Sequence, residues 1–267
     1  RAIGGPASWP GISPSSGTTS TVARAELRSA CVTLLCLLKL RYPTHYTLLR
    51  GNHESRDVNR TNGFHAEIMQ KYPDEDEAVK LYEMFNEVFD CLPLAALLCD
   101  CRILCMHGGI SKSIDKLEQI NEIRRPLPDP LSNNIARDLL WADPVYGIKG
   151  YEPNAIRGVA DSFGEDVLQE FLAKHDLKMI VRGHQKMKKG VAFFSDLRLV
   201  TIFTATANYP GVKEPTIGAV MLMSNKGEFG FRLMATFTND EPKGYEWFTE
   251  YYDNEDNDND YRVVKRA

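Results

Sequence analysis

The chain lacks the excess positive charge and the long apolar run that mark two common classes of protein. Its 32 Lys and Arg are outnumbered by 36 Asp and Glu, for a formal net charge of −4. That balance gives no general reason to expect binding to nucleic acid or to an anionic membrane. The longest apolar run, residues 32–40, is too short to span a bilayer, and no signal-peptide pattern is present. We therefore expect neither a nucleic-acid partner nor a membrane partner.

Metal-binding cysteine pairs are also missing. None of the six cysteines belongs to a CxxC pair, and most lie within apolar runs of the first 105 residues. They are Cys31, Cys36, Cys91, Cys99, Cys101 and Cys105. This usage predicts reduced core side chains in a cytoplasmic or nuclear protein.

Histidine and carboxylate are missing from the beginning of the sequence. No histidine precedes His45 and no carboxylate precedes Glu26. Residues 1–21 are rich in Gly, Pro, Ser and Thr, which predicts a disordered leader. At the other end, six acidic residues lie between positions 250 and 260. They predict an acidic, flexible tail over residues 241–267.

Residues 22–240 alternate between helical and strand-like apolar patterns, which predicts one α/β domain with a sheet-on-sheet core. Helical spacing predicts helices near residues 27–38, 78–89 and 165–175. Short apolar runs predict strands at 46–49, 103–106, 179–181, 199–204, 217–223 and 229–237. Proline and glycine predict irregular segments at 124–130 and 141–153.

Polar residues follow three of these predicted strands, each beside glycine. Asn52 and His53 come after Gly51, while His107 and His184 end two later strand-like runs. Open α/β sheets place their chemistry at the carboxyl ends of strands. Any one of these histidines alone is more often an ordinary core or loop residue. Three equivalent positions together favour a shared site.

The residue types at this expected site suit a metal and a phosphate group. Asn52 offers an amide oxygen, and His107 and His184 offer imidazoles, which bind Zn, Fe and Mn well. Arg24 and Arg157 lie in predicted loops, and a guanidinium group matches phosphate oxygens bidentately. Taken singly, each arginine is more often an ordinary surface residue.

Five short motifs, in order, resemble the serial motifs of the phosphoprotein phosphatase family of Ser/Thr phosphatases. They are LLRGNHESR (48–56), MHGGI (106–110), LLWADP (139–144), RGHQ (182–185) and NY (208–209). The segments CLPLAAL (91–97) and KHDL (174–177) are most similar to the type-1 catalytic subunits. The similarity runs from about residue 30 to residue 237. It implies a metallophosphoesterase-type β-sandwich flanked by helices, here N-terminally incomplete.

The resemblance implies hydrolysis of phosphoserine and phosphothreonine monoesters at a two-metal centre of Mn, Fe or Zn, which activates a bridging water. It implies that Asn52, His107 and His184 bind one of the metals. It also implies that His53 is the acid that protonates the leaving oxygen. Further implied roles are phosphate binding by Arg24, Arg157 and Tyr209, and lining of the active-site cleft by Asp143.

The sequence departs from the family at its first two motifs. Gly-Asp-x-His-Gly, which supplies ligands to the other metal, does not occur in these 267 residues. Counted back from residues 50–54, the second motif falls on 19–25 (TSTVARA). Ser20 takes the place of the metal-bridging Asp, and Ala23 takes the place of the Asp that orients the acid. Because a hydroxyl does not balance two divalent cations, we expect one bound metal or none.

Three functions are compatible with these motifs. The first is a Ser/Thr protein phosphatase, with this chain a truncated or mis-spliced version of the active enzyme. The second is a catalytically impaired pseudophosphatase that binds phosphoproteins or regulatory subunits. The third is a metallophosphoesterase for small phosphate esters, against which the type-1-like segments argue. The resemblance also implies a hydrophobic groove for regulatory subunits at Ile103, Met179 and Phe193. Plain core packing is the alternative for these residues, above all for Ile103.

Overall fold

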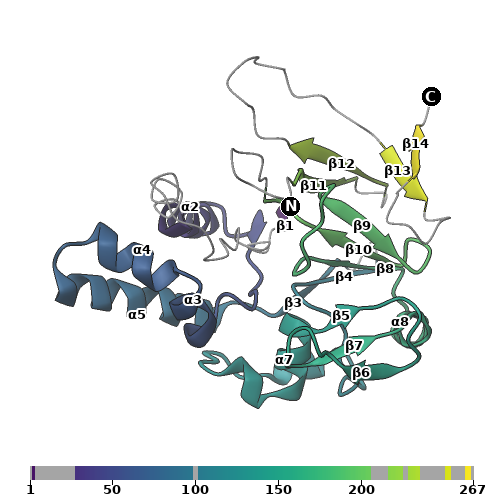
Figure 1. The fold of residues 1–267 in the computed structure, drawn as a ribbon, viewed down its shortest axis with the longest axis horizontal. Helices are drawn as coiled ribbons and strands as arrows, with labels where there is room; N and C mark the ends of the chain where they lie inside the picture. The colour runs from purple at the N-terminus through teal and green to yellow at the C-terminus, as the bar shows by residue number, and fades with distance from the viewer. Residues whose placement is uncertain are drawn as a thin grey trace.

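The computed structural model describes residues 2–3, 28–98, 102–205, 216–224, 228–234, 250–253 and 262–265. In these residues, a layer of helices lies beside a stack of β-sheets (Figure 1). No described helix is long and apolar enough to cross a membrane. The family-like α/β fold expected from the sequence is therefore present, and its sheets determine where the candidate site lies.

The central sheet has five strands in the order β3-β4-β8-β10-β9. Its middle strands are parallel, namely β4 (Ile103–Met106), β8 (Met179–Arg182) and β10 (Leu199–Ile202). The outer strands β3 (Ala95–Leu98) and β9 (Val191–Phe194) are antiparallel to their neighbours. All three middle strands were predicted from their apolar runs. Because they are parallel, the loops that follow β4, β8 and β10 emerge at one edge of the sheet.

A second, two-stranded sheet packs on one face of the central sheet. It consists of β11 (Gly218–Met223) and β12 (Phe229–Met234), which are antiparallel. The core between the two sheets includes Ile103, Met179 and Phe193, which are 4%, 7% and 4% exposed. The expected sheet-on-sheet core is confirmed. The three residues lie where plain packing would place them, and the regulatory-subunit groove stays a prediction from sequence.

The other face of the central sheet is covered by helices and a small third sheet. Helices α7 (Asn134–Trp141) and α8 (Glu165–Lys174) pack there, with α8 close to its predicted bounds. The third sheet pairs β5 (Asp143–Pro144), β7 (Asp161–Phe163) and β6 (Tyr151–Pro153). Within the segment predicted to be irregular, 141–153, β5 and β6 are short strands, and residues 145–150 between them are irregular as predicted. Shorter elements nearby are α6 (Gln119–Glu122) and the 3-10 turn η2 (Pro130–Ser132).

The helical layer consists of α2 (Arg28–Arg41), α3 (Arg56–Thr61), α4 (Phe64–Lys71) and α5 (Glu75–Cys91). Helix α5 agrees with its prediction, because Ala78, Tyr82 and Phe89 are buried. On α2, helical spacing predicts a buried face made of Leu27, Ala30, Cys31, Leu34, Leu35 and Leu38. That face is largely wrong, because Ala30 and Cys31 are exposed and Leu34 is 57% exposed, whereas Val32, which is outside it, is buried. The buried face also carries polar Ser29, whose hydroxyl donates to Glu67 at 2.8 Å. Hydrophobic spacing alone therefore predicted the wrong face of the helix to be buried.

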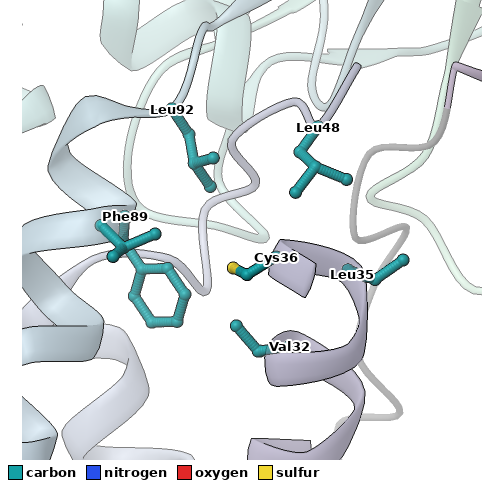
Figure 2. A pocket seen from close by; sticks show the side chains of 7 residues that line it. Val32, Leu35, Cys36, Leu48, Phe89 and Leu92 are labelled. Carbon is teal, nitrogen blue, oxygen red and sulfur yellow. The ribbon is translucent and has the colours of Figure 1, made fainter. Parts of the chain in front are cut away.

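A small apolar pocket separates α2 from α5. Figure 2 shows Val32 and Cys36 of α2 facing Phe89 of α5, with Leu48 and Leu92 above them. The free thiols differ in their surroundings, because Cys105 is buried whereas Cys31 and Cys91 are exposed. The expectation that the cysteines are core residues is therefore wrong for the latter two. Cys99 and Cys101 lie outside the described residues.

Short strands also occur near both ends of the chain. The pair β1 (Ala2–Ile3) and β2 (Tyr46–Thr47) is parallel, and β13 (Glu250–Asp253) pairs antiparallel with β14 (Arg262–Lys265). These strands lie partly within the segments predicted as a leader and an acidic tail. Tyrosine in β13 and valine in β14 favour strands. The prediction of a flexible tail considered only the acidic residues and therefore did not include these strands.

Candidate functional site

The loop after β2 carries Asn52 and His53 and is held by a buried arginine. Arg50, which is fully buried, donates to the backbone oxygen of Glu54 at 2.9 Å and to Asp90 at 3.1 Å. The backbone N–H of Gly51 donates to a carboxylate oxygen of Glu54 at 2.9 Å. A Cβ at position 51 would lie 2.5 Å from that oxygen. A larger residue here would displace the Glu54 carboxylate from its bond to the loop backbone.

His107 directly follows β4, at the carboxyl edge of the central sheet. The next residue, Gly108, donates its N–H to the carbonyl of Leu139 in α7 at 2.7 Å. A Cβ on Gly108 would lie 2.5 Å from the backbone of Leu140. This close backbone approach is what the neighbouring glycine was expected to provide.

His184 follows β8 at the same edge. Its φ of 68° lies in the left-handed region, which is uncommon for a residue with a side chain. The N–H of Gly183 donates to the carbonyl of His107 at 3.1 Å, which joins the two strand ends. The ring of Trp141 meets that of His184 edge-on, with 5.6 Å between centroids. Gly183 itself has space, since a Cβ there would have no neighbour closer than 3.7 Å.

The three expected metal ligands converge. Nε2 of His107 lies 2.7 Å from Oδ1 of Asn52 and 3.2 Å from Nδ1 of His184. Burial holds the pKa of His107 well below its ordinary value, with His184 and Arg182 adding to the effect. Burial, followed by Arg182 and Arg157, lowers the pKa of His184 to about 2. Both imidazoles are therefore neutral and present lone pairs.

These donor atoms fit one divalent metal ion. Ligand atoms that each lie about 2.1 Å from a shared ion are roughly 3 Å apart, as these are. A single N–H at Nε2 of His107 could not donate well to both Asn52 and His184. A cation would instead bind the lone pairs of all three side chains at once. In the part of the chain that the structure describes, no cluster of three or more His, Cys, Asp or Glu has metal-binding geometry. The group of Asn52, His107 and His184 is not such a cluster, because only its two histidines are of these residue types.

A buried carboxylate supports this site from behind. Asp143 accepts a hydrogen bond from Nη2 of Arg182 at 2.7 Å and another from Nε of Arg157 at 3.0 Å. It accepts a third from Asn154 at 3.1 Å. Asp143 is buried beneath the partly exposed Arg157, and its expected role in lining the active-site cleft stays a prediction. Nη2 of Arg157 also lies 3.4 Å from the carbonyl of His184, which places this guanidinium beside the metal ligands.

Arg182 connects several of the site loops. It donates to Asp143 and to the backbone carbonyls of Gly108 and Ala142, and it contacts Gln185 at 2.7 Å. Its side chain is fully buried, and burial lowers its pKa to about 10 despite the opposing effect of Asp143. Arg182 therefore joins the loops that follow β4, α7 and β8.

His53 is half-buried and flanked by positive charge. Burial, followed by repulsion from Arg28 and Arg157, lowers its pKa to about 4. Arg28, at the start of α2, is buried, donates to the carbonyl of Asn62, and has no hydrogen-bond partner for its Nε among the described residues. Arg28 is not among the site residues predicted from the sequence. The only sequence feature that indicates it is an arginine at the start of an apolar helix.

The structure thus gathers Asn52, His107, His184 and Arg157 at one edge of the sheet, with Asp143 beneath, and His53 follows Asn52 directly. Arg24 and Tyr209 lie outside the described residues, as do the departures at Ser20 and Ala23. Arg50 and Arg182 have no role predicted from the sequence. Both occur within motifs, but only the structure shows what they bind.

Two comparisons with known proteins show what the chain is similar to. The model of the calcineurin-like phosphoesterase family matches residues 21–187. Among solved structures, the chain is similar to a protein serine/threonine phosphatase from Saccharomyces cerevisiae with similarity to human phosphatase PP5. The sequence identity is 29%, the TM-score is 0.67, and the match covers 80% of this chain and 68% of that one. The family match spans the loops that carry Asn52, His107 and His184, and the chain belongs to the calcineurin-like phosphoesterase family.

Proposed function

We propose that the chain carries a Ser/Thr phosphatase-type site for phosphoserine and phosphothreonine monoesters in proteins. The observation that carries the proposal is the convergence of Asn52, His107 and His184 next to Arg157. The similarity to the yeast phosphatase supports the substrate class. The type-1-like segments at residues 91–97 and 174–177 support the type-1 subclass over small-molecule phosphoesterases.

Each residue of the site has a distinct part in this proposal. A divalent ion held by Asn52, His107 and His184 would act as a Lewis acid towards a phosphoryl oxygen. Arg157 keeps its Nε on Asp143, which fixes the guanidinium plane. Its side chain is 27% exposed, so its remaining N–H groups can bind phosphate oxygens. His53 follows Asn52 in the same loop, and in this proposal its imidazole contacts the ester oxygen.

A second function, phosphoprotein binding with little turnover, is favoured by two residues of the second family motif. Ser20 replaces a carboxylate that bridges the metals, and Ala23 replaces the carboxylate that orients the acid histidine. Residues of a catalytic unit contribute in a strongly non-additive way, so these two changes act together on the rate. Phosphate binding by Arg157 does not depend on either carboxylate. We therefore propose that this chain binds phosphopeptide better than it hydrolyses it.

The deciding experiment measures phosphoserine-peptide binding and hydrolysis in the presence of Mn²⁺. The chain is compared with a repaired version that carries Ser20→Asp, Ala23→Asp and a grafted Gly-Asp-x-His-Gly motif. We expect both proteins to bind the peptide and only the repaired one to turn it over rapidly. A rate in the unrepaired chain that equals the repaired rate, and that His53→Ala abolishes, would exclude the binding-only function. Absence of phosphopeptide binding in both would exclude the phosphatase class.

A further inference from the structure

An isoleucine beside the candidate site is almost fully exposed. Ile156 lies directly before Arg157, in the turn of residues 154–160 that connects β6 to β7 of the third sheet (Figure 1). Its exposed fraction is 91%, the highest of the large hydrophobic side chains in the part of the chain that the structure describes. Single exposed apolar residues are common on proteins, so the exposure alone indicates no function. Ile156 is distinguished by its position next to the arginine that the proposed function assigns to phosphate.

The turn that carries Ile156 is bonded to the support of the site. Asn154, which is 4% exposed, donates its side-chain amide to Asp143 at 3.1 Å. Its side-chain oxygen accepts from the N–H of Arg157 at 3.1 Å, and its carbonyl accepts from the N–H of Gly158 at 2.8 Å. Arg157 donates its Nε to the same oxygen of Asp143 at 3.0 Å. The carboxylate that orients the guanidinium group therefore also anchors the backbone on both sides of Ile156.

The surface of this turn is apolar apart from one charge. Arg157 is the only charged residue among residues 154–160 (NAIRGVA). Ala155 is exposed beside Ile156, and Val159 and Ala160 are half-buried. Neighbouring Cα atoms are about 3.8 Å apart, so an apolar side chain and a guanidinium group project from adjacent points of one turn. A peptide that places an anionic group on Arg157 therefore passes close to an apolar surface.

We propose that Ile156 selects phosphorylated protein segments that carry an apolar side chain one or two positions from the phosphorylated residue. This rests on the proposed function, because it takes the phosphate to bind Arg157. An extended peptide advances about 3.3 Å per residue, so the residues next to the phosphorylated one stay within reach of Ile156. Contact between two apolar side chains removes both from water, which stabilises the complex in proportion to the area covered. A polar side chain at the same position of the peptide gains no such stabilisation.

The test measures binding of fluorescent phosphoserine peptides to the full chain with Mn²⁺. Two peptides of equal length and net charge carry either leucine or glutamine on both sides of the phosphoserine, and their unphosphorylated forms are the other probes. Ile156→Ser removes the apolar side chain, whereas Ile156→Val keeps most of it. The matched control is Val79→Ser, which removes an apolar side chain that is 46% exposed on α5. Because all these positions are exposed, the variants should fold normally, and binding of inorganic phosphate is measured for each of them.

We expect the unmodified chain to bind the leucine phosphopeptide about fivefold more tightly than the glutamine phosphopeptide. Ile156→Ser should lose this preference, while Ile156→Val and Val79→Ser keep it and all variants bind inorganic phosphate equally. Equal affinity for the two phosphopeptides, or a preference that survives in Ile156→Ser, would overturn the proposal. So would weaker binding of inorganic phosphate by Ile156→Ser, because Ile156 would then act by holding Arg157 in place. Phosphopeptides of both sequences that bind no better than their unphosphorylated forms would contradict the proposed function itself, and this inference with it.

Discussion

The edge of the central sheet and the outer face of α2 use their side chains in opposite ways. At the sheet edge, polar groups are buried and bonded to one another, as Asp143 is to Arg157 and Arg182. On α2, Leu34 and Leu37 are more than half exposed, while polar Ser29 is buried. Buried polar groups tolerate little change, because each lost contact leaves another group unsatisfied. Exposed apolar groups have few contacts to lose, so the two regions should respond very differently to substitution.

The largest expected effect comes from Arg182→Met, which removes a guanidinium that is fully buried. The substitution leaves Asp143 and the carbonyls of Gly108 and Ala142 without this donor. Breaking a buried ion pair from one side typically costs about 3–5 kcal/mol, and we expect that loss in the free energy of unfolding by urea.

The matched control is Arg102→Met, since Arg102 also pairs with a carboxylate but on the surface. The side chains of Arg102 and Asp176 are 45% and 80% exposed. Surface pairs contribute about 0–1 kcal/mol, so this variant should unfold almost as the unmodified chain does. Equal losses in the two variants would show that the network around Asp143 contributes no more than a surface pair.

The next largest effect is a difference in thermal stability between alanine substitutions at two glycines of the site loops. Gly108→Ala places a Cβ 2.5 Å from the backbone of Leu140, whereas Gly183→Ala has no neighbour closer than 3.7 Å. Overpacking costs typically about 1–3 kcal/mol, so we expect a lower Tm for the first variant. The second should be neutral or slightly stabilised, because alanine restricts the unfolded chain. A lower Tm for Gly183→Ala than for Gly108→Ala would contradict the geometry of the two loops.

The same contrast explains what the sequence could predict. The strands before His107 and His184 are short, continuous apolar runs, so their positions followed from composition alone. Their parallel pairing brings the two loops together at one edge, as the general behaviour of α/β sheets suggested. Asn52, His107 and His184 could be proposed as one group because glycine marks the strand end beside each of them.

The support beneath the site was not predictable in this way. Arg50 is 40 residues from Asp90, and Arg182 is 39 residues from Asp143, yet each pair is in direct contact. Local spacing carries no information about such distant pairs. The prediction of which α2 face is buried was wrong for a related reason. Ser29 is buried because its hydroxyl donates to Glu67, 38 residues away. Hydrophobic periodicity ignores a polar residue that finds a buried partner.

The smallest expected effect tests the α2 side of the comparison. Leu34→Gln with Leu37→Gln replaces side chains that are largely solvent-exposed, and surface changes usually alter stability by no more than about 0.5 kcal/mol. The buried neighbour Val32 is the control, since Val32→Ala removes packing against the α4–α5 core and should cost roughly 1–3 kcal/mol. Urea unfolding measures both, and binding of a hydrophobic dye to the native chain should fall only in the double variant, because exposed apolar patches bind such probes. A loss of stability in the double variant as large as that of Val32→Ala would mean that these leucines are packed, and the contrast between the sheet edge and α2 would no longer hold.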